Sequence, residues 1–115
     1  ELGIKNCYYD NDYWAGAVKQ CGGVNNLPTM ADLGKLASAI YKGNPSVGAK
    51  QDVNNLAYES GTATSLGLPE PSFYLWSGEE YNSYHAYSRG FYSTYTLWYY
   101  SNRDYSTIQA VCLGD

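Results

Sequence analysis

Apolar side chains recur with helical spacing near the start of the chain, and the first run predicts a helix. Asp12 has a side chain typical of helix N-caps, and Gly22-Gly23 is a pair that ends helices. Between them, apolar residues are spaced as on one face of a helix. This stripe consists of Trp14, Ala17, Val18 and Cys21. A short strand over residues 2–9 is predicted to precede this helix.

A second helix is predicted to begin at Thr29, whose hydroxyl is a common N-cap. Asp32 lies three residues further on, at the position of the acidic partner in a capping box. The segment 43–45, Gly-Asn-Pro, ends the helix. Its apolar positions again repeat with helical spacing and form the expected buried face: Met30, Leu33, Leu36, Ala37, Ile40 and Tyr41.

Residues 43–72 form a long polar connection. Within it, residues 51–58 are predicted to form a short helical turn, and residues 60–71 are predicted to be loop because they are rich in Gly, Pro, Ser and Thr. A connection of this length inside a small domain is usually functional or folded on itself.

The rest of the chain has runs of aromatic and β-branched residues that predict strands. Polar segments at 79–83 and 101–106 are predicted to be turns between them. Two helices followed by such strands indicate an α+β domain, with the helices packed on an antiparallel β-meander. The length predicts one domain over residues 1–115. The predicted strands are 73–77, 84–92, 95–100 and 107–113.

The net charge of the chain argues against one class of partner, nucleic acids. The chain has 7 Lys and Arg against 11 Asp and Glu, a net charge of −4, whereas nucleic-acid binding requires a basic patch. We therefore predict no nucleic-acid partner. No apolar segment approaches the length of a membrane span, so we predict no direct membrane contact. The chain begins at Glu1 rather than Met, which we interpret as a processed or shortened chain whose targeting segment has been removed.

The last third of the chain combines few apolar anchors with many Tyr, Ser, Asn, His and Thr residues. Eight tyrosines fall between residues 81 and 105, more than the core of so small a domain can hold, so some must be exposed. Clustered exposed Tyr with Ser and Asn spacers is typical of a recognition surface. The candidate ligand-binding residues are Tyr81, Asn82, Tyr84, His85, Tyr87, Tyr92, Tyr95, Tyr99, Tyr100, Asn102 and Tyr105. Four other tyrosines are expected to pack partly against the core: Tyr13, Tyr41, Tyr58 and Tyr74.

The residue types do not favour catalysis. His85 is the only histidine, and no orienting carboxylate lies near it in sequence, so a nucleophile–His–Asp arrangement is poorly supported. Glu79 and Glu80 are adjacent and would face opposite sides of a strand. We predict no enzymatic activity and no cofactor. Arg103 has two interpretations: it stacks on a ligand, or it supports the loops, and we favour the second.

The cysteines Cys7, Cys21 and Cys112 leave several arrangements open. An odd count is consistent with one disulfide and a leftover thiol, with a partner cysteine elsewhere, or with three buried thiols in a cytosolic protein.

The segment 26–33, Asn-Leu-Pro-Thr-Met-Ala-Asp-Leu, resembles the start of a helix in bacterial C-type-lectin-like domains, which include relatives of the formylglycine-generating enzymes. The tail resembles the same family in the order of its motifs, and the resemblance covers roughly residues 12–115. It implies a C-type-lectin-like fold in which a cysteine of the first helix bonds to one in the last strand. The tail motifs are Leu75-Trp76-Ser77-Gly78, Ala86, Phe91, Asn102-Arg103 and Ala110-Val111-Cys112.

Carried over to this chain, the resemblance pairs Cys21 with Cys112 and leaves Cys7 free or paired elsewhere. A bridge between Cys7 and Cys21 is the alternative. The formylglycine-generating relatives require a reactive cysteine arrangement in the tail, where this chain has Cys112 alone. The segment 70–72, Glu-Pro-Ser, resembles a calcium-binding element of sugar-binding C-type lectins but lacks its Asn. Calcium favours six to eight oxygen ligands, so we predict no metal site.

The residues that fill the tail resemble a more specific group, the variable proteins of diversity-generating retroelements. These proteins use the C-type lectin fold and are rewritten at adenines, often in Asn codons, which readily yield Tyr, Ser, Asn, Asp, His and Thr. Similar domains also occur as C-terminal parts of pilin-like proteins. We predict a secreted or surface-displayed binding domain. Its flat Tyr- and Ser-rich surface favours a protein ligand over a small molecule, and a carbohydrate is the less favoured partner. The rival interpretation is a pilin-like or adhesin subunit whose tyrosines pack against neighbouring subunits.

Overall fold

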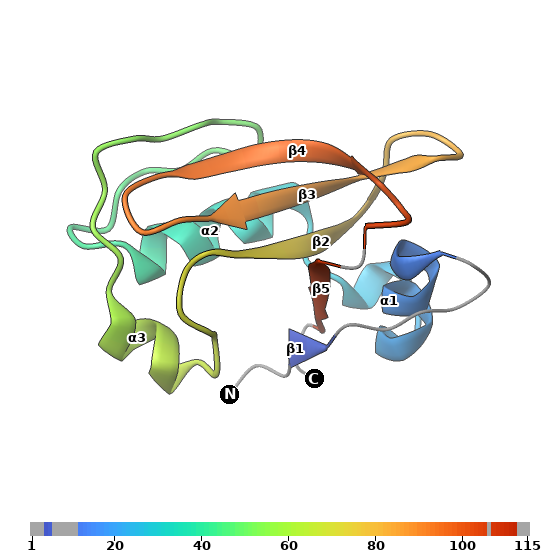
Figure 1. Ribbon diagram of the computed structural model, residues 1–115, viewed down its shortest axis with the longest axis horizontal. Coiled ribbons are helices and arrows are strands. Elements are labelled where there is room, and N and C mark those ends of the chain that lie inside the picture. Colours follow the sequence, from blue (N-terminus) through green and yellow to red (C-terminus); the bar gives the residue numbers. More distant parts are fainter. Residues whose placement is uncertain (1–3, 6–11, 106, 113–115) are drawn as a thin grey trace.

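Three consecutive antiparallel strands form the larger part of the sheet in the computed structural model, which describes residues 4–5, 12–105 and 107–112. These strands are β2 (Phe73–Glu80), β3 (His85–Phe91) and β4 (Thr96–Asn102). Two short strands extend the sheet beyond β2: β5 (Ile108–Val111) and β1 (Ile4–Lys5). The strand order is β1-β5-β2-β3-β4, so β4 is an edge strand (Figure 1).

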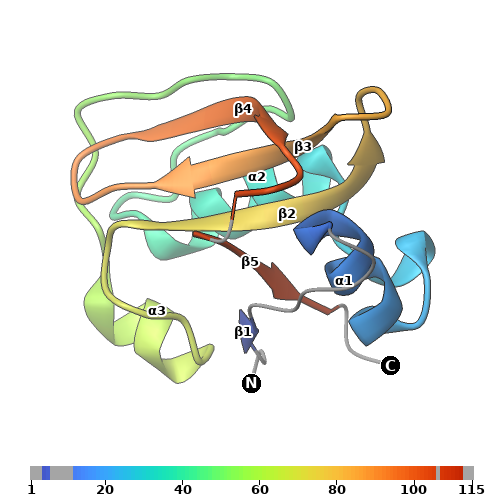
Figure 2. The same ribbon diagram turned by 45° about the vertical axis from the view of Figure 1, so that its right-hand side comes forward.

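The predicted α+β class is confirmed, but the prediction of one continuous meander is wrong at its last strand. After β4 the chain crosses to the opposite side of β2, where β5 pairs in parallel with it and β1 pairs antiparallel with β5. Figure 2 shows this first and last strand side by side. The physical reason is the burial of apolar side chains of β5. Ile108 and Ala110 pack against α1 and Trp76, which β5 can reach beside β2 and not beside β4.

Both predicted helices and their N-caps are confirmed. The second helix ends at Ile40, before the predicted stop at residues 43–45, because Tyr41 is extended and pairs with Tyr58. In α1 (Tyr13–Cys21) an Asp12 side-chain oxygen accepts a hydrogen bond from the Ala15 N–H at 2.9 Å. Gly22 ends the helix with φ of 82°, a conformation that favours glycine. In α2 (Met30–Ile40) Thr29 and Asp32 form the reciprocal capping box. A 3₁₀ turn, η1 (Val24–Asn26), connects the two helices.

Of the two predictions for the long connection, the helical turn is wrong and the loop is wrong in its first half. Residues 51–58, predicted as a helical turn, contain no helix; Val53 pairs with Thr96 at the edge of β4, and Tyr58 pairs with Tyr41. This segment finds its hydrogen-bond partners on the sheet rather than within itself. Residues predicted as loop contain α3 (Ser60–Ser65), whose Ala63 is buried in the α2 core. With one buried residue, so short a helix has no stripe for a sequence pattern to detect.

Each face of the sheet is covered at one end by a different helix. On one face Phe73, Leu75 and Phe91 pack beneath α2. On the opposite face Trp76 and Ala86 pack against α1. The alternation of side chains along β2 and β3 produces this division, because successive residues of a strand point to opposite faces. Each face therefore has an end that is not covered by its helix.

Two buried polar side chains attach the connecting segments to the sheet. Arg89 of β3 is fully buried and donates hydrogen bonds to the carbonyls of Gly48 at 3.0 Å and Gln51 at 2.9 Å. It also donates to Thr96 Oγ1 of β4 at 3.1 Å. Tyr41, at the end of α2, donates to the Tyr92 carbonyl, which precedes the turn between β3 and β4. These side chains donate the hydrogen bonds that buried backbone carbonyls would otherwise accept from water. In doing so they join the helix, the connection and the sheet.

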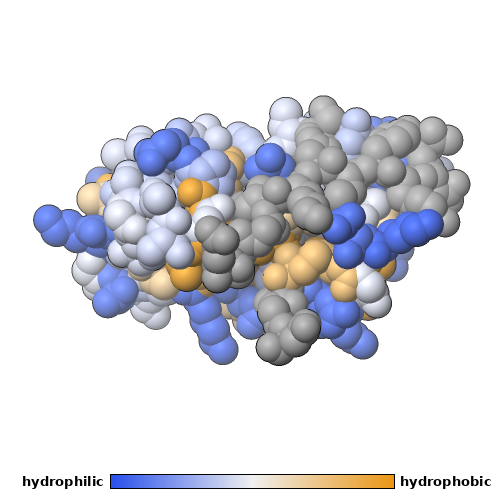
Figure 3. All heavy atoms as spheres, turned by 90° about the horizontal axis from the view of Figure 1, so that it is seen from below, coloured by the Kyte–Doolittle hydropathy of each residue, from blue (hydrophilic) through white to orange (hydrophobic). Residues whose placement is uncertain are grey.

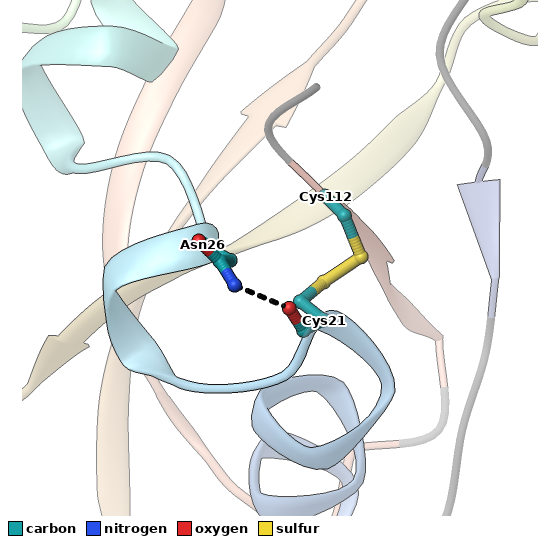
Figure 4. Close-up of a disulfide and its surroundings, with 3 residues drawn as sticks. All are labelled: Cys21, Asn26 and Cys112. Atoms are coloured by element: carbon teal, nitrogen blue, oxygen red, sulfur yellow. Dashed lines mark hydrogen bonds between the residues drawn. A yellow bond between two sulfur atoms is a disulfide. The ribbon is translucent and has the colours of Figure 1, made fainter. Parts of the chain in front are cut away.

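A disulfide joins the end of α1 to the end of β5, and it confirms the predicted pairing of Cys21 with Cys112. The two Cα atoms are 5.2 Å apart and the residues are separated by 91 positions in sequence. Figure 4 shows the bridge, with the Asn26 side-chain amide donating to the Cys21 carbonyl beside it. The alternative Cys7–Cys21 bridge is excluded because Cys21 is bonded to Cys112; Cys7 itself lies outside the described residues.

Of the strand predicted at residues 2–9, the structure describes Ile4–Lys5 as β1, and the remaining positions lie outside the described residues. Within the described chain, no helix combines the length and apolar character needed to cross a membrane.

We predict that replacing both bridged cysteines, Cys21→Ser with Cys112→Ser, lowers the free energy of unfolding by about 4 kcal/mol. The reason is that the bridge restricts the unfolded chain over a long loop. Urea-induced unfolding, followed by tryptophan fluorescence, measures the difference. Adding a reductant should destabilise the wild-type protein and leave the double variant unchanged. A double variant that unfolds within about 1 kcal/mol of wild type would contradict the role assigned to the bridge.

Candidate ligand-binding surface

The face of the sheet that packs beneath α2 continues, beyond the helix, into a group of aromatic rings. The register places Tyr87 of β3 directly opposite Tyr100 of β4, and Arg89 opposite Trp98. Residues opposite each other on neighbouring strands share a face. Tyr87 and Tyr100 therefore extend the same face as Arg89, at the end of the sheet near the β2–β3 turn.

These rings contact one another, and we call them the aromatic patch: Tyr81, His85, Tyr87, Trp98 and Tyr100. Tyr81 and Tyr100 are stacked, with ring centroids 4.3 Å apart and an interplanar angle of 12°. Tyr81 also meets Tyr87 edge to face at 5.4 Å. The remaining contacts join His85 to Tyr81 and Tyr100, and Trp98 to Tyr87 and Tyr100. Because the rings support each other, little side-chain entropy remains to be lost on binding.

The turn between β2 and β3 is built by Asn82, whose side-chain oxygen accepts from the backbone N–H groups of Tyr84 and His85 at 2.8 and 2.7 Å. This arrangement exposes Tyr84, 73% of whose surface is accessible to solvent. Asn102 plays a similar part after β4, accepting from the Asp104 N–H at 2.9 Å. Both predicted contact residues thus shape turns with their side-chain oxygens.

Arg103 supports the loops, as we favoured from the sequence. Its guanidinium bonds the Glu80 carboxylate at 2.7 Å and the Asn82 carbonyl, which lie in and beside the β2–β3 turn. It also lies 4.4 Å from the centroid of the Trp14 ring, and 3.6 Å from the Asp12 carboxylate. The turn below the aromatic patch is therefore fixed to the start of α1 through one side chain.

Lys50 brings a positive charge to the aromatic patch from the distant connection. Its Nζ lies 4.3 Å from the centroid of the Tyr87 ring and 3.2 Å from the Tyr87 hydroxyl. A cation over an aromatic face is attracted by the ring's negative quadrupole. Nothing in the local sequence of 43–58 identifies this residue, because the contact depends on the path that Arg89 imposes on the connection.

Four tyrosines gather on the opposite face, and we call them the tyrosine network: Tyr74, Tyr92, Tyr95 and Tyr99. The Tyr92 hydroxyl lies 2.8 Å from that of Tyr74 and 2.6 Å from that of Tyr99. The Tyr92 and Tyr95 rings are stacked with centroids 4.4 Å apart. All four side chains are half-buried. Their hydroxyls are largely committed to one another, unlike the outward-facing groups of the aromatic patch.

Gly90 makes room for the tyrosine network. A Cβ at this position would lie 2.9 Å from a Tyr74 ring carbon and 3.0 Å from a Tyr92 ring carbon. Both rings lie over the bare backbone of β3 as a result. Glycine is required here because a side chain would collide with the two rings, and not because the backbone has an unusual φ.

A cavity of about 350 Å³ adjoins the tyrosine network beneath β4 and beside β5. Its lining residues are Tyr74, Tyr99, Ser101, Tyr105, Thr107 and Ile108. The lining is aromatic and hydroxyl-bearing and carries no charged side chain among these residues. Seen from below, the part of the surface that is not grey carries apolar atoms in separate areas among polar ones (Figure 3).

The structure therefore divides the predicted site residues between two surfaces. Tyr81, His85, Tyr87 and Tyr100 lie together in the aromatic patch, with Tyr84 on the adjoining turn. The sheet separates them from Tyr92, Tyr95 and Tyr99, while Tyr105 lines the cavity with 56% of its surface exposed. Sequence reasoning missed two members, Trp98 and Tyr74. Tyr74 lies two residues before Trp76 on β2, so strand alternation puts both side chains on the same face of the sheet. That face is the one on which Tyr74 meets Tyr92.

Burial raises the pKa of several phenols. For Tyr58 burial, with a smaller contribution from the Glu70 charge, raises the pKa to about 12. Burial also raises the pKa of Tyr41, and its hydrogen bond to the Tyr92 carbonyl offsets only part of that rise. In the tyrosine network, burial raises the pKa of Tyr92, and the hydrogen bonds with Tyr74 and Tyr99 raise it further. Burial raises the pKa of Tyr99 as well.

Among the described residues, no group of three or more His, Cys, Asp or Glu side chains is arranged to hold a metal ion. The His85 Nδ1 lies 3.0 Å from the Asn82 side-chain oxygen, so its nearest orienting partner is an amide and not a carboxylate. Comparisons of the chain with models of known protein families, with curated proteins and with solved structures find no match.

We predict that the protein loses stability as pH rises above about 10, where tyrosines of the unfolded chain ionise. Phenols whose pKa is raised in the fold stay neutral there, so the unfolded state loses protons first and stability falls. For the buried Tyr41 the expected slope is about 1.4 kcal/mol per pH unit. Tyr41→Phe should lower stability at pH 7, because its hydrogen bonds are lost, yet flatten this alkaline slope.

Urea-induced unfolding between pH 7 and pH 11 measures this slope, with Tyr84→Phe as the matched control for loss of one hydroxyl. An alkaline slope that is the same in wild type and in Tyr41→Phe would contradict the assignment.

Proposed function

We propose that this chain is a non-catalytic binding domain with a C-type-lectin-like fold, whose ligand is another protein bound at the aromatic patch. Three features support the fold: α1 and α2 lie between the first strand and β2, the first and last strands are paired, and a disulfide joins the first helix to the end of the last strand. The fold in this proposal matters because it leaves the β2–β3 turn and the adjoining strands free to carry the ligand surface.

The observation that carries the proposal is the exposure of tyrosines that are already held in place. Tyr81 and Tyr100 are stacked on each other and still expose 45% and 51% of their surface, and Tyr84 beside them exposes 73%. Exposed aromatic side chains are costly in water and are enriched at binding surfaces, where they are the commonest energetic anchors. A rigid group of tyrosines gives large contact area at small entropic cost.

The arrangement of the rings favours a protein over a sugar or a small molecule. The stacked faces of Tyr81 and Tyr100 are used by each other, so ring edges and hydroxyls are presented outward. Such a surface suits the many weak polar and apolar contacts of a protein partner. Sugar recognition through calcium would require a cluster of carboxylate oxygens, and the described residues contain no such cluster.

We also propose that the domain is a variable protein of a diversity-generating retroelement. Support comes from how residue types are distributed. Tyr81, Tyr84 and Tyr100 are of a type that adenine-directed changes readily produce, and all three are exposed, whereas Trp76, Ala86 and Phe91 are buried. The buried Ser88, Thr96 and Ser101 are also of such types, so the proposal concerns the exposed tyrosines. The exposed tyrosines can be replaced without changing the buried residues that form the core. The disulfide is consistent with an oxidising environment, and we propose a secreted or cell-surface location.

The test of diversification is the DNA beside the coding sequence. We predict a near-copy of the segment encoding the tail, differing at adenines and adjacent to a reverse transcriptase gene. The substituted codons should be those of the exposed residues and not those of Trp76, Ala86 and Phe91. Genome sequence without such a repeat would reduce the proposal to a tyrosine-rich binding domain of fixed sequence.

The test of binding compares the two tyrosine surfaces. We predict that Tyr81→Ser with Tyr84→Ser weakens binding to a protein ligand at least tenfold, because it removes the exposed anchors. The matched control, Tyr95→Ser with Tyr105→Ser, changes two tyrosines that lie outside the aromatic patch and should bind as wild type. Ligands are first identified by screening the wild-type domain against an array of secreted and surface proteins, and affinities are then measured by biolayer interferometry.

Thermal unfolding of both double variants controls for folding. Equal binding by wild type and the Tyr81/Tyr84 variant, or loss of binding in the control alone, would overturn the assignment to the aromatic patch. Loss of self-assembly without loss of a ligand would instead favour the structural subunit.

A further inference from the structure

The cavity beside the tyrosine network lies where the chain crosses from β4 over β2 to β5 (Figure 2). Its lining includes Tyr74 of β2, Tyr99 and Ser101 of β4, and Ile108 of β5. The volume of about 350 Å³ falls at the lower end of the range for small-molecule sites. Because the cavity adjoins the tyrosine network, it lies on the face of the sheet opposite to the aromatic patch and is a separate site.

The Tyr74 hydroxyl has a proton that the tyrosine network does not use. Tyr74 accepts a hydrogen bond from the Tyr92 hydroxyl at 2.8 Å, so its own proton takes no part in that bond. The second bond of the network joins Tyr92 to Tyr99 and does not involve Tyr74. Within the part of the chain that the structure describes, no acceptor receives the Tyr74 proton. A ligand oxygen in the cavity would be such an acceptor, and the hydroxyl bonded behind Tyr74 would polarise and strengthen the new bond.

A pair of buried serines supplies a second unused proton. The hydroxyls of Ser88 and Ser101 lie 2.9 Å apart, and either of them can be the donor. Two hydroxyls have two protons, and one bond between them uses one. Both serines are buried, with Ser101 9% exposed, and Ser101 is the one that lines the cavity. When Ser88 donates to Ser101, the remaining proton belongs to Ser101 and is available to a ligand in the cavity.

The rest of the lining restricts the chemistry of that ligand. Most of the lining surface is apolar, formed by tyrosine rings and Ile108, and none of the lining residues is charged. A charged ligand would lose its hydration without gaining an opposite charge, which is costly. A sugar has hydroxyls around its whole ring, more than this lining can satisfy. An aromatic ring with one oxygen matches both the apolar walls and the few hydroxyl donors.

We propose that this cavity binds a neutral aromatic small molecule that carries a single hydrogen-bonding oxygen, as a phenol does. The ring packs against the apolar lining, and the oxygen accepts from the unused hydroxyl protons of Tyr74 and Ser101. The site goes beyond the proposed function, because it lies on the other face of the sheet and shares no residue with the aromatic patch.

Four small probes of similar size test the class of ligand. We predict that 4-methylphenol binds with a dissociation constant on the order of 1 mM, as expected of so small a ligand. Toluene, which lacks the oxygen, should bind about fivefold more weakly because one hydrogen bond is lost. Benzoate and benzylammonium, which carry opposite charges, should show no binding up to about 20 mM. Two-dimensional NMR of the full chain measures binding, and the amide shifts should change at Ser101, Thr107 and Ile108 and not at Tyr84.

Two variants with matched controls test the location. Tyr74→Phe removes the unused donor and should weaken binding of 4-methylphenol about fivefold. Tyr95→Phe removes one hydroxyl from the same network outside the lining, and should bind as wild type. Thr107→Trp places a large side chain at an exposed position of the lining and should abolish binding. Thr94→Trp makes the same change at an exposed position of the β3–β4 turn, and should have no effect.

Failure of 4-methylphenol to bind wild type overturns the proposal, as does equal binding by wild type and Thr107→Trp. Binding of either charged probe as tightly as 4-methylphenol overturns the ligand class, as does tighter binding of methyl glucoside, a neutral sugar. The Tyr81→Ser with Tyr84→Ser variant should bind 4-methylphenol as wild type, and Thr107→Trp should keep the affinity for a protein ligand. Loss of protein binding in Thr107→Trp would instead assign the cavity to a side chain of that protein and overturn the proposal. Each site can therefore fail its test without the other.

Discussion

A buried arginine determines how this small sheet is divided into a covered part and a displayed part. Arg89 has no solvent exposure, and its guanidinium holds the carbonyls of Gly48 and Gln51 together with the Thr96 hydroxyl. Burial lowers its pKa, and the nearby Asp52 charge acts in the opposite direction. Removing such a group leaves carbonyls without partners inside the protein, at a cost of several kcal/mol.

The position of the connecting segment has consequences on both sides of Arg89. Toward α2, the segment closes the core over Phe91 and covers the edge of β4 as far as Trp98. Toward the β2–β3 turn, the segment no longer covers the sheet face. The aromatic patch begins there, with Lys50 over the Tyr87 ring. Core, covered edge and displayed rings are thus consecutive regions of one sheet face. The displayed side chains add contact surface without being needed to close the core.

The parts of the fold that could be predicted from the sequence are those whose signals are local. Asp12, Thr29 and Asp32 mark helix starts within a few residues of the stripes that they precede. The pairing of β5 with β2 could not be predicted in this way, because it depends on where Ile108 and Ala110 find a buried site. The course of residues 51–58 depends on hydrogen bonds to β4 and to the turn before it, which no local pattern encodes.

The candidate site was predicted in composition but not in arrangement. Tyrosine-rich sequence identifies the residues, yet it treats them as one surface. Strand alternation separates them, since Tyr99 and Tyr100 are neighbours in sequence and point to opposite faces. The same reasoning applied to Tyr87 on β3 and to Tyr92, which directly follows β3, would have given two groups. Lys50, by contrast, reaches Tyr87 only through the tertiary path set by Arg89.

The most direct test of this account is residue-resolved hydrogen exchange in an Arg89→Met variant, which keeps an unbranched side chain and removes the donors. We expect the amides of Val53 and Thr96, which pair the connection to β4, to exchange at least about 100-fold faster than in wild type, as loss of roughly 3 kcal/mol of local stability implies. Amides in α1 should change far less. Unchanged exchange at Val53 and Thr96 would contradict the claim that Arg89 holds the connection on the sheet.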